Sequence, residues 1–272
     1  MPRFIHDEGA GTGTGLESHL ARESAQYVYA TLIALAWCNA LELMVLCLNT
    51  FKRYHGCYFW SLLIASFAII PFGLGYILRL WNISFSNGFV ELAIIDISWA
   101  AMVTGHSLVL WSRLHLVLHH PRVLRALLYL IIIDGVLVHS AAGTLEIVRD
   151  ALPDSHTATL AFGVIERIQL VWFCLQELLL SALYIRETAR MLRLDQSSIS
   201  RSVLAQLLGI NVVIMVLDLS VVAVQYAGYF TLQVTMKSLV YSVKLKLEYV
   251  ILGRLVDVAH IRTQGEAPRF RF

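Results

Sequence analysis

The chain has 272 residues, of which 58% are hydrophobic and only 15% are charged. A soluble domain usually carries about a quarter of its residues as Asp, Glu, Lys or Arg, so this composition argues against a water-soluble fold. The net charge of +2 is too small for a nucleic-acid-binding protein, because the basic residues form short clusters beside apolar runs. We therefore expect the lipid bilayer as the main partner of the chain, and no nucleic acid.

The chain begins with a polar stretch that contains Gly and Thr but lacks the basic start and apolar centre of a cleaved signal peptide. We interpret residues 1–24 as a flexible extracellular or lumenal tail, 25–256 as one transmembrane domain, and 257–272 as a short cytoplasmic tail. The cysteines lie in or beside apolar runs and show no metal-binding spacing. Neither an extracellular disulfide nor a cysteine-based metal site is therefore expected.

Seven apolar runs follow one another along the chain, each long enough to cross about 30 Å of hydrocarbon as a helix. Backbone amides have no water to bond inside lipid, and the runs are too long and continuous for barrel strands. The predicted spans are residues 26–50, 58–80, 88–111, 123–146, 160–185, 203–227 and 230–252. The expected fold class is therefore an all-α, polytopic bundle of seven transmembrane helices, with Pro71 inside the second span.

Basic residues are distributed unequally between the two sets of connections. The connections after the first, third and fifth spans and the C-terminal tail contain most of the arginines. The positive-inside rule then places the N-terminus outside and the C-terminus in the cytoplasm, of either the plasma membrane or an endomembrane. Asn82 begins a glycosylation sequon in a connection predicted to lie outside, which agrees with this orientation.

Ionisable and amide side chains interrupt the apolar runs at positions that share helix faces. A charge at the bilayer centre costs at least about 2.5 to 3.5 kcal/mol on insertion scales, so these groups should face one another rather than lipid. Lys246 points away from this face of the seventh span, but lies near enough to the cytoplasmic end for its stem to snorkel. The predicted interior polar network consists of Glu42, Asp96, His106, Asp134, Glu177, Asn211, Asp218, Lys244 and Glu248.

Lys244 is the centre of this predicted network. Glu42, Asp134 and Asp218 are expected near its depth on other helices, and Glu248 lies one helical turn away. We therefore predict that Lys244 pairs with at least one of these acids. Two interpretations stay open. The first is an interhelical network that holds the bundle together, and the second is a buried site for a ligand, ion or proton.

Two specific chemistries fit this pattern less well. Lys244 has the depth of the retinal-binding lysine of rhodopsins, but other lysines lie close by and no further opsin motif is present. His106 and His139 could combine with Asp96 or Asp134 as zinc ligands, but the chain contains no HExxH motif. Histidines in membrane spans more often form hydrogen bonds within the packing. We therefore predict no enzyme activity, no cofactor and no metal.

The stretches YFWSLLIASFAIIP, WSRLHLVLHHPRVLR and YSVKLKLEYVILGRLV together resemble a family of fungal integral membrane proteins with seven predicted helices. The resemblance covers nearly everything from Ala25 to Val256, and it implies a fungal source and a membrane location without an assigned activity. The layout is also similar to that of G-protein-coupled receptors, with Arg113 at the cytoplasmic end of the third span. Ser112 rather than an acid precedes this arginine, so the similarity is one of architecture, and architecture does not fix function.

The leading hypothesis is a receptor-like, non-enzymatic membrane protein with a polar interior site near Lys244 and a cytoplasmic face at Arg113. Its further partners would be a small-molecule ligand and a cytoplasmic signalling partner. The alternative is a small solute or proton-coupled transporter, although the chain shows no inverted repeat or paired broken helices. An intramembrane enzyme is the third hypothesis.

Overall fold

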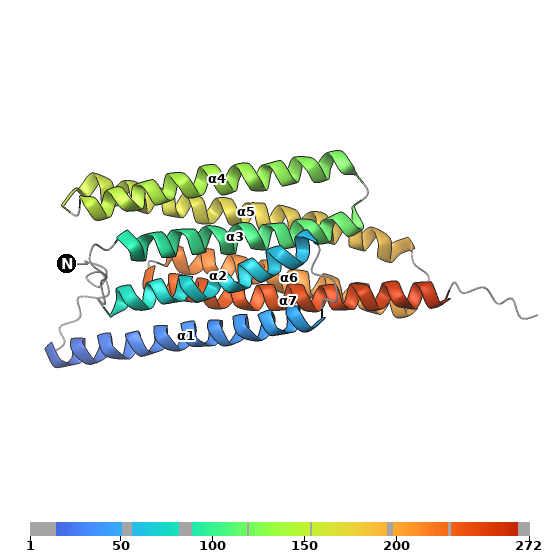
Figure 1. Ribbon diagram of the computed structural model, residues 1–272, viewed down its shortest axis with the longest axis horizontal. Helices are drawn as coiled ribbons and strands as arrows, with labels where there is room; N and C mark the ends of the chain where they lie inside the picture. The colour runs from blue at the N-terminus through green and yellow to red at the C-terminus, as the bar shows by residue number, and fades with distance from the viewer. Residues whose placement is uncertain are drawn as a thin grey trace, which may run out of the picture.

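The computed structural model describes residues 15–50, 56–81, 89–118, 120–152, 154–194, 198–227 and 230–265. These residues form the helices α1 (Gly15–Thr50), α2 (Cys57–Leu80), α3 (Phe89–Val117), α4 (Pro121–Ala151), α5 (His156–Leu194), α6 (Ser198–Tyr226) and α7 (Phe230–Gly265). The helices run up and down side by side as one bundle (Figure 1). The described part of the chain contains no strand, so the prediction of an all-α bundle of seven helices is confirmed.

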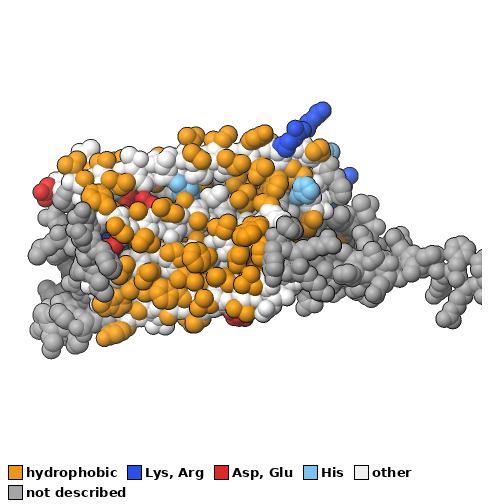
Figure 2. Space-filling model, in the orientation of Figure 1, with side chains coloured by type: hydrophobic (Ala, Val, Ile, Leu, Met, Phe, Trp, Pro, Cys, Tyr) orange, Lys and Arg blue, Asp and Glu red, His pale blue; other side chains and the backbone are white. Residues whose placement is uncertain are grey.

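Six of these helices, α1 to α6, are long and apolar enough to cross a membrane. Hydrophobic side chains cover most of the described surface on the face seen in Figure 2. The helix α7 runs along the bundle beside the others, but it carries Lys237, Lys244, Lys246 and Glu248, which lower its hydropathy. An apolar outer surface with polar groups inside is the pattern that lipid requires of a helix bundle, so the protein is a multi-pass membrane protein.

Two helices extend into segments that the sequence predicts as tails. The helix α1 begins at Gly15, within the expected tail 1–24, and α7 continues to Gly265, within the expected tail 257–272. Hydropathy marks only where a chain enters lipid, whereas backbone hydrogen bonding can continue a helix beyond that point. Asn82, the glycosylation candidate, lies outside the described residues.

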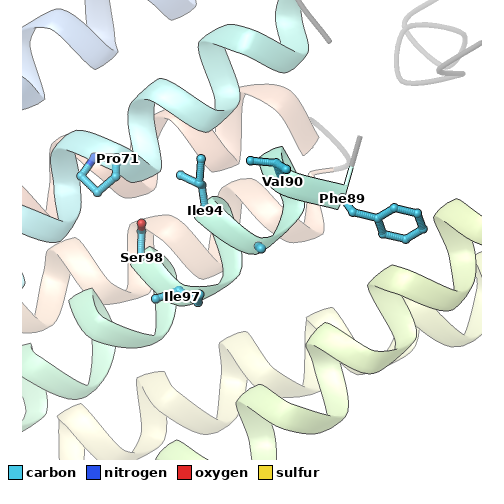
Figure 3. A pocket seen from close by; sticks show the side chains of 7 residues that line it. Pro71, Phe89, Val90, Ile94, Ile97 and Ser98 are labelled. Carbon is cyan, nitrogen blue, oxygen red and sulfur yellow. The ribbon is translucent and has the colours of Figure 1, made fainter. Parts of the chain in front are cut away.

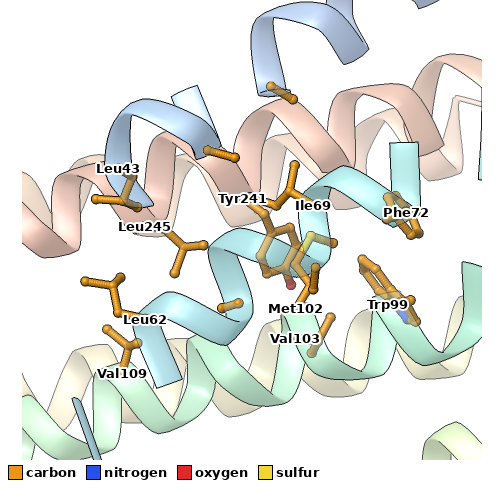
Figure 4. Close-up of a cluster of buried hydrophobic side chains, with 14 of the residues drawn as sticks. Leu43, Leu62, Ile69, Phe72, Trp99, Met102, Val103, Val109, Tyr241 and Leu245 are labelled. Carbon is orange, nitrogen blue, oxygen red and sulfur yellow. The ribbon is translucent and has the colours of Figure 1, made fainter. Parts of the chain in front are cut away.

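The helices α3 and α7 occupy the centre of the bundle. The helix α3 contacts α2, α4, α5 and α7, while α7 contacts α1, α2, α3 and α6. The largest hydrophobic core lies where α1, α2, α3 and α7 meet (Figure 4). Its fully buried members include Leu43, Ile69, Met102 and Leu245, one from each of these helices. This core fixes one side of α7 and leaves its polar side toward α3, α5 and α6.

Glycines allow α2 and α3 to pack closely together. A Cβ atom added to Gly105 of α3 would lie 2.9 Å from the Cβ of Ala65 and 3.2 Å from the backbone oxygen of Ser61, both on α2. A Cβ added to Gly75 of α2 would lie 2.5 Å from Cγ1 of Ile95 on α3. Small residues at such contacts let the backbones of membrane helices approach each other.

We expect Gly105→Leu to destabilise the bundle by about 1–3 kcal/mol, because the larger side chain must displace the α2 backbone. The matched control is Gly163→Leu, since a Cβ added to Gly163 meets nothing within 4 Å. The measurement is the midpoint of thermal unfolding of each purified variant in detergent. An equal loss of stability in both variants would contradict the close approach of α2 and α3.

Candidate functional site

Lys244 lies at the centre of a buried ionic network that joins α5, α6 and α7. Its Nζ atom donates to Glu177 Oε2 on α5 at 2.5 Å and to Asp218 Oδ1 on α6. The same Nζ lies 4.2 Å from the centroid of the Tyr241 ring. All four side chains are buried, and Lys244 is fully inaccessible. One of the expected pairings of Lys244, that with Asp218, is present. Its second partner is Glu177, which was predicted as a member of the network but not as a partner of this lysine.

Glu177 extends the network to α3 through its other carboxylate oxygen. Oε1 accepts a hydrogen bond from the Tyr241 hydroxyl at 3.1 Å and lies 3.0 Å from Nδ1 of His106. Because an ionised carboxylate only accepts, the neutral His106 tautomer that fits carries its proton on Nδ1. Its Nε2 atom is then an acceptor, and it has no hydrogen-bond partner among the described residues. Glu177 thus binds donors from α3 and α7 at once.

A second ion pair lies one helical turn further along α7. Nε of Arg113 on α3 lies 2.7 Å from Glu248 Oε2, and its Nη2 donates to Asn211 Oδ1 on α6 at 3.2 Å. The guanidinium carbon lies 4.6 Å from the centroid of the Tyr184 ring on α5. Arg113, Asn211 and Glu248 have no exposed surface. Together Lys244 and Arg113, with their partners, connect α3, α5, α6 and α7 at two successive levels.

Arg113, which was predicted at the cytoplasmic face, does not project from the surface of the bundle. Its side chain is 0% exposed and turns into the bundle toward Glu248. A buried carboxylate without a partner is strongly unfavourable, so the arginine nearest to Glu248 on a neighbouring helix neutralises it. Arg113 therefore belongs to the interior network.

Three predicted members of the network lie elsewhere. Glu42 of α1 pairs with Lys246 at 2.7 Å, with 54% of the Glu42 side chain exposed, so neither residue joins the interior. Asp96 of α3 lies beside Glu146 of α4. Asp134 of α4 is partly buried, and its Oδ2 has no partner among the described residues. Helical spacing identifies inward faces, but the packing of the helices decides which inward residues meet.

A second polar cluster, centred on Glu146 and Asp150 of α4, was not predicted. Arg79 of α2 lies 3.6 Å from Glu146 Oε1 and 3.1 Å from Asp150 Oδ2. Arg149 lies 3.2 Å from Glu146 and 2.7 Å from Asp150, and its guanidinium lies 4.0 Å from the centroid of the Phe162 ring on α5. Arg79 and Glu146 fall at the ends of the predicted spans 58–80 and 123–146, and Arg149 and Asp150 lie just beyond the second of these spans.

Lys237 of α7 lies between this second cluster and the central network. Its Nζ atom lies 3.6 Å from Glu166 Oε1 on α5 and 4.7 Å from the centroid of the Trp99 ring on α3. Lys237 precedes Lys244 by seven residues, so the two lysines share one face of α7. The sequence therefore predicts an inward-facing Lys237, but it does not predict the partner Glu166.

The central network contains more acids than cations. Glu177, Asp218 and Glu248 face Lys244 and Arg113, while the His106 tautomer described above is uncharged. An uncompensated charge is costly in a low-dielectric interior, so the network is electrically balanced when it holds one additional proton. Asp218 Oδ2 and Glu248 Oε1 have no hydrogen-bond partner among the described residues, so either atom has room for that proton.

The two histidines considered as zinc ligands are not brought together. His139 of α4 lies 3.0 Å from Nε2 of Gln169 and stacks on Phe173 with the ring centroids 4.8 Å apart, whereas His106 contacts Glu177. Within the described residues, no group of three His, Cys, Asp or Glu side chains is arranged to hold a metal ion. The hydrogen-bond partners of His106 and His139 are the side chains of Glu177 and Gln169 on the neighbouring helix α5.

A shallow groove on the lipid-facing surface lies between α2 and α3 (Figure 3). It has a volume of about 430 Å³ and is lined by Pro71, Ile94, Ile97 and Ser98, with Phe89 and Val90 at one end. The Ser98 hydroxyl is the polar side-chain group in this lining. The groove suits a lipid chain and offers little to hold a polar ligand.

The fold and the network define a multi-pass helical membrane protein whose central helices are joined by buried ion pairs. The chain belongs to the family described as a domain of unknown function, DUF7703, whose model matches residues 19–266. The match includes α2 to α7 completely, and α1 from its second turn onward. A search of curated proteins finds no match. The fungal source implied by the sequence resemblance stays a prediction.

We expect Lys244→Leu to destabilise the protein by roughly 3–5 kcal/mol, because it leaves two buried carboxyl groups without their cation. The matched control is Lys246→Leu. The partner of Lys246, Glu42, is half-exposed, so this substitution should lower the stability by at most about 1 kcal/mol. The measurement is thermal unfolding of the purified proteins in detergent. If Lys244→Leu melted at the wild-type temperature, the central role of this lysine would be contradicted.

The Arg113–Glu248 pair is suited to a double-mutant cycle. Arg113→Met and Glu248→Met should each cost about 3–5 kcal/mol, because each leaves one buried charge alone, whereas the double variant should recover much of that stability. The unfolding midpoints of the four proteins provide the coupling energy. A double variant as unstable as the sum of the two single variants would show that the two groups do not interact.

Proposed function

We propose that the protein is a receptor-like, non-enzymatic membrane protein in which the ionic network holds one arrangement of the central helices. The observation that supports this proposal is the connection of four helices by two buried cations and the carboxylates paired with them. Lys244 joins α7 to α5 and α6, and Arg113 joins α3 to α6 and α7. Buried ion pairs that can exchange partners give a bundle two discrete states rather than a continuous range. A small-molecule ligand would select one state, and a cytoplasmic partner would recognise it.

The proposal includes the orientation of the chain. Exposed Arg122, Arg125, Arg186 and Arg190 lie at the end of the bundle where α4 begins and α5 ends. The positive-inside rule assigns this end to the cytoplasm, and the N-terminus to the opposite side. The course of α7, parallel to α1, α3 and α5 in Figure 1, agrees with seven crossings and termini on opposite sides.

The proposal can be tested by measuring the separation of α3 and α6 at the proposed cytoplasmic end. Spin labels at exposed Leu116 and Ser202, in a background without other reactive cysteines, allow a pulsed electron resonance measurement. We expect Glu248→Gln to add a second, longer distance, because Arg113 loses its charged partner. Glu42→Gln is the matched control, since its ion pair is half-exposed on α1. An unchanged distance in folded Glu248→Gln protein would contradict the proposal.

The second candidate is a proton-coupled transporter, and the surplus carboxyl group of the central network favours it. Lys237, Tyr241, Lys244 and Glu248 follow one face of α7, so ionisable groups extend from the second cluster to the Arg113 pair. Chains of Asp, Glu and His residues form proton relays in membrane transporters.

Proteoliposomes that enclose a pH-sensitive dye separate the two candidates. For the receptor-like protein we expect no proton flux after a pH step, with either wild-type protein or Asp218→Asn. A flux in the wild-type protein that Asp218→Asn abolishes would favour the transporter and count against the receptor. Glu42→Gln is again the control, because a flux through the central network should not depend on Glu42.

A further inference from the structure

The lipid-facing side of α5 contains a charged residue within an apolar surface. Val164, Ile168, Trp172 and Leu175 form this surface, and each is between 46% and 56% exposed. Arg167 is exposed in the same stripe. Among the residues that the structure describes, no acid forms an ion pair with it. A guanidinium at lipid depth needs an anion or water, so Arg167 requires a partner from outside the protein.

A groove lies directly beside Arg167, between α5 and the end of α6. It has a volume of about 310 Å³ and is lined by Arg167, the apolar side chains of that stripe, and Tyr226. Tyr226 is the last residue of α6 and is 65% exposed. Tyrosines at helix ends are typical of the level of the lipid headgroups, so the groove leads from that level into the hydrocarbon.

The direction of α5 brings the Arg167 charge toward the headgroups. Side chains in an α-helix lean toward its N-terminus, and the N-terminus of α5 lies at the same end of the bundle as Tyr226. The apolar stem of an arginine can lie along the helix while its guanidinium reaches the interface. A guanidinium also matches a phosphate with two parallel hydrogen bonds.

We propose that this groove binds a phospholipid, with its phosphate on Arg167 and the Tyr226 hydroxyl, and one acyl chain along Val164, Ile168, Trp172 and Leu175. Charge complementarity selects this occupant, because a neutral lipid would leave the guanidinium without an anion. The groove between α2 and α3 has a similar size but no cation, and so gives no such selectivity (Figure 3). The proposal is independent of the function proposed above.

The test is native mass spectrometry of the full chain in mild detergent, titrated with dioleoyl phosphatidylglycerol. We expect a saturable adduct that Arg167→Gln weakens roughly tenfold, since one charge-assisted contact is lost. Arg122→Gln is the matched control, because Arg122 is exposed at the opposite end of the bundle. Equal lipid binding by Arg167→Gln and wild type, with both proteins folded, would overturn the proposal.

Three further measurements separate the phosphate from the acyl chain. Ile168→Trp should also weaken the adduct, because it fills the groove while Arg167 stays in place. Dioleoylglycerol, which has the same chains without phosphate, should bind weakly, and inorganic phosphate should not compete at the same concentration. If dioleoylglycerol bound as well as the phospholipid, or if phosphate alone displaced it, the proposed site would be incorrect.

Discussion

The structure depends on the mutual neutralisation of charges that lipid cannot solvate. Lys244 and Arg113 lie on different helices, and their carboxylate partners lie on two others and on α7 itself. Each ion must therefore be reached by a partner within a few ångströms, which restricts the rotation and depth of α3, α5, α6 and α7 relative to one another. The hydrophobic core against α1 and α2 contributes buried apolar surface, whereas these ion pairs determine the rotation and depth of each helix relative to its neighbours.

The fold could be predicted from the sequence because the bilayer imposes one solution on long apolar runs. The pairing of Lys244 with Asp218 could be predicted too, because both lie near mid-membrane on inward faces. The burial of Arg113 could not be predicted, because a charge near the end of an apolar run usually indicates the start of a loop. Glu177 shows a further limit, because several acids at similar depth compete for one lysine and only helix packing decides between them.

The same network supports two functional proposals because ion pairs and proton sites use the same groups. A receptor needs the ion pairs to exchange partners, whereas a transporter needs the surplus proton to leave and return. In the structure His106, Glu177 and Lys244 are almost completely buried, so the interior is closed in this conformation. The family has no assigned activity, so both functions rest on the geometry of the site rather than on the architecture.

The Trp99 ring of α3 contacts two residues of the polar face of α7, Lys237 and Tyr241. One part of its ring faces the ammonium of Lys237 at 4.7 Å, and it meets the Tyr241 ring edge to face at 5.7 Å. Tyr241 in turn donates to Glu177. Lys237, Trp99, Tyr241 and Glu177 therefore form one continuous series of side-chain contacts that ends at the central carboxylate. One aromatic side chain of α3 thus separates the Lys237–Glu166 pair from the central network while touching the α7 residues of both.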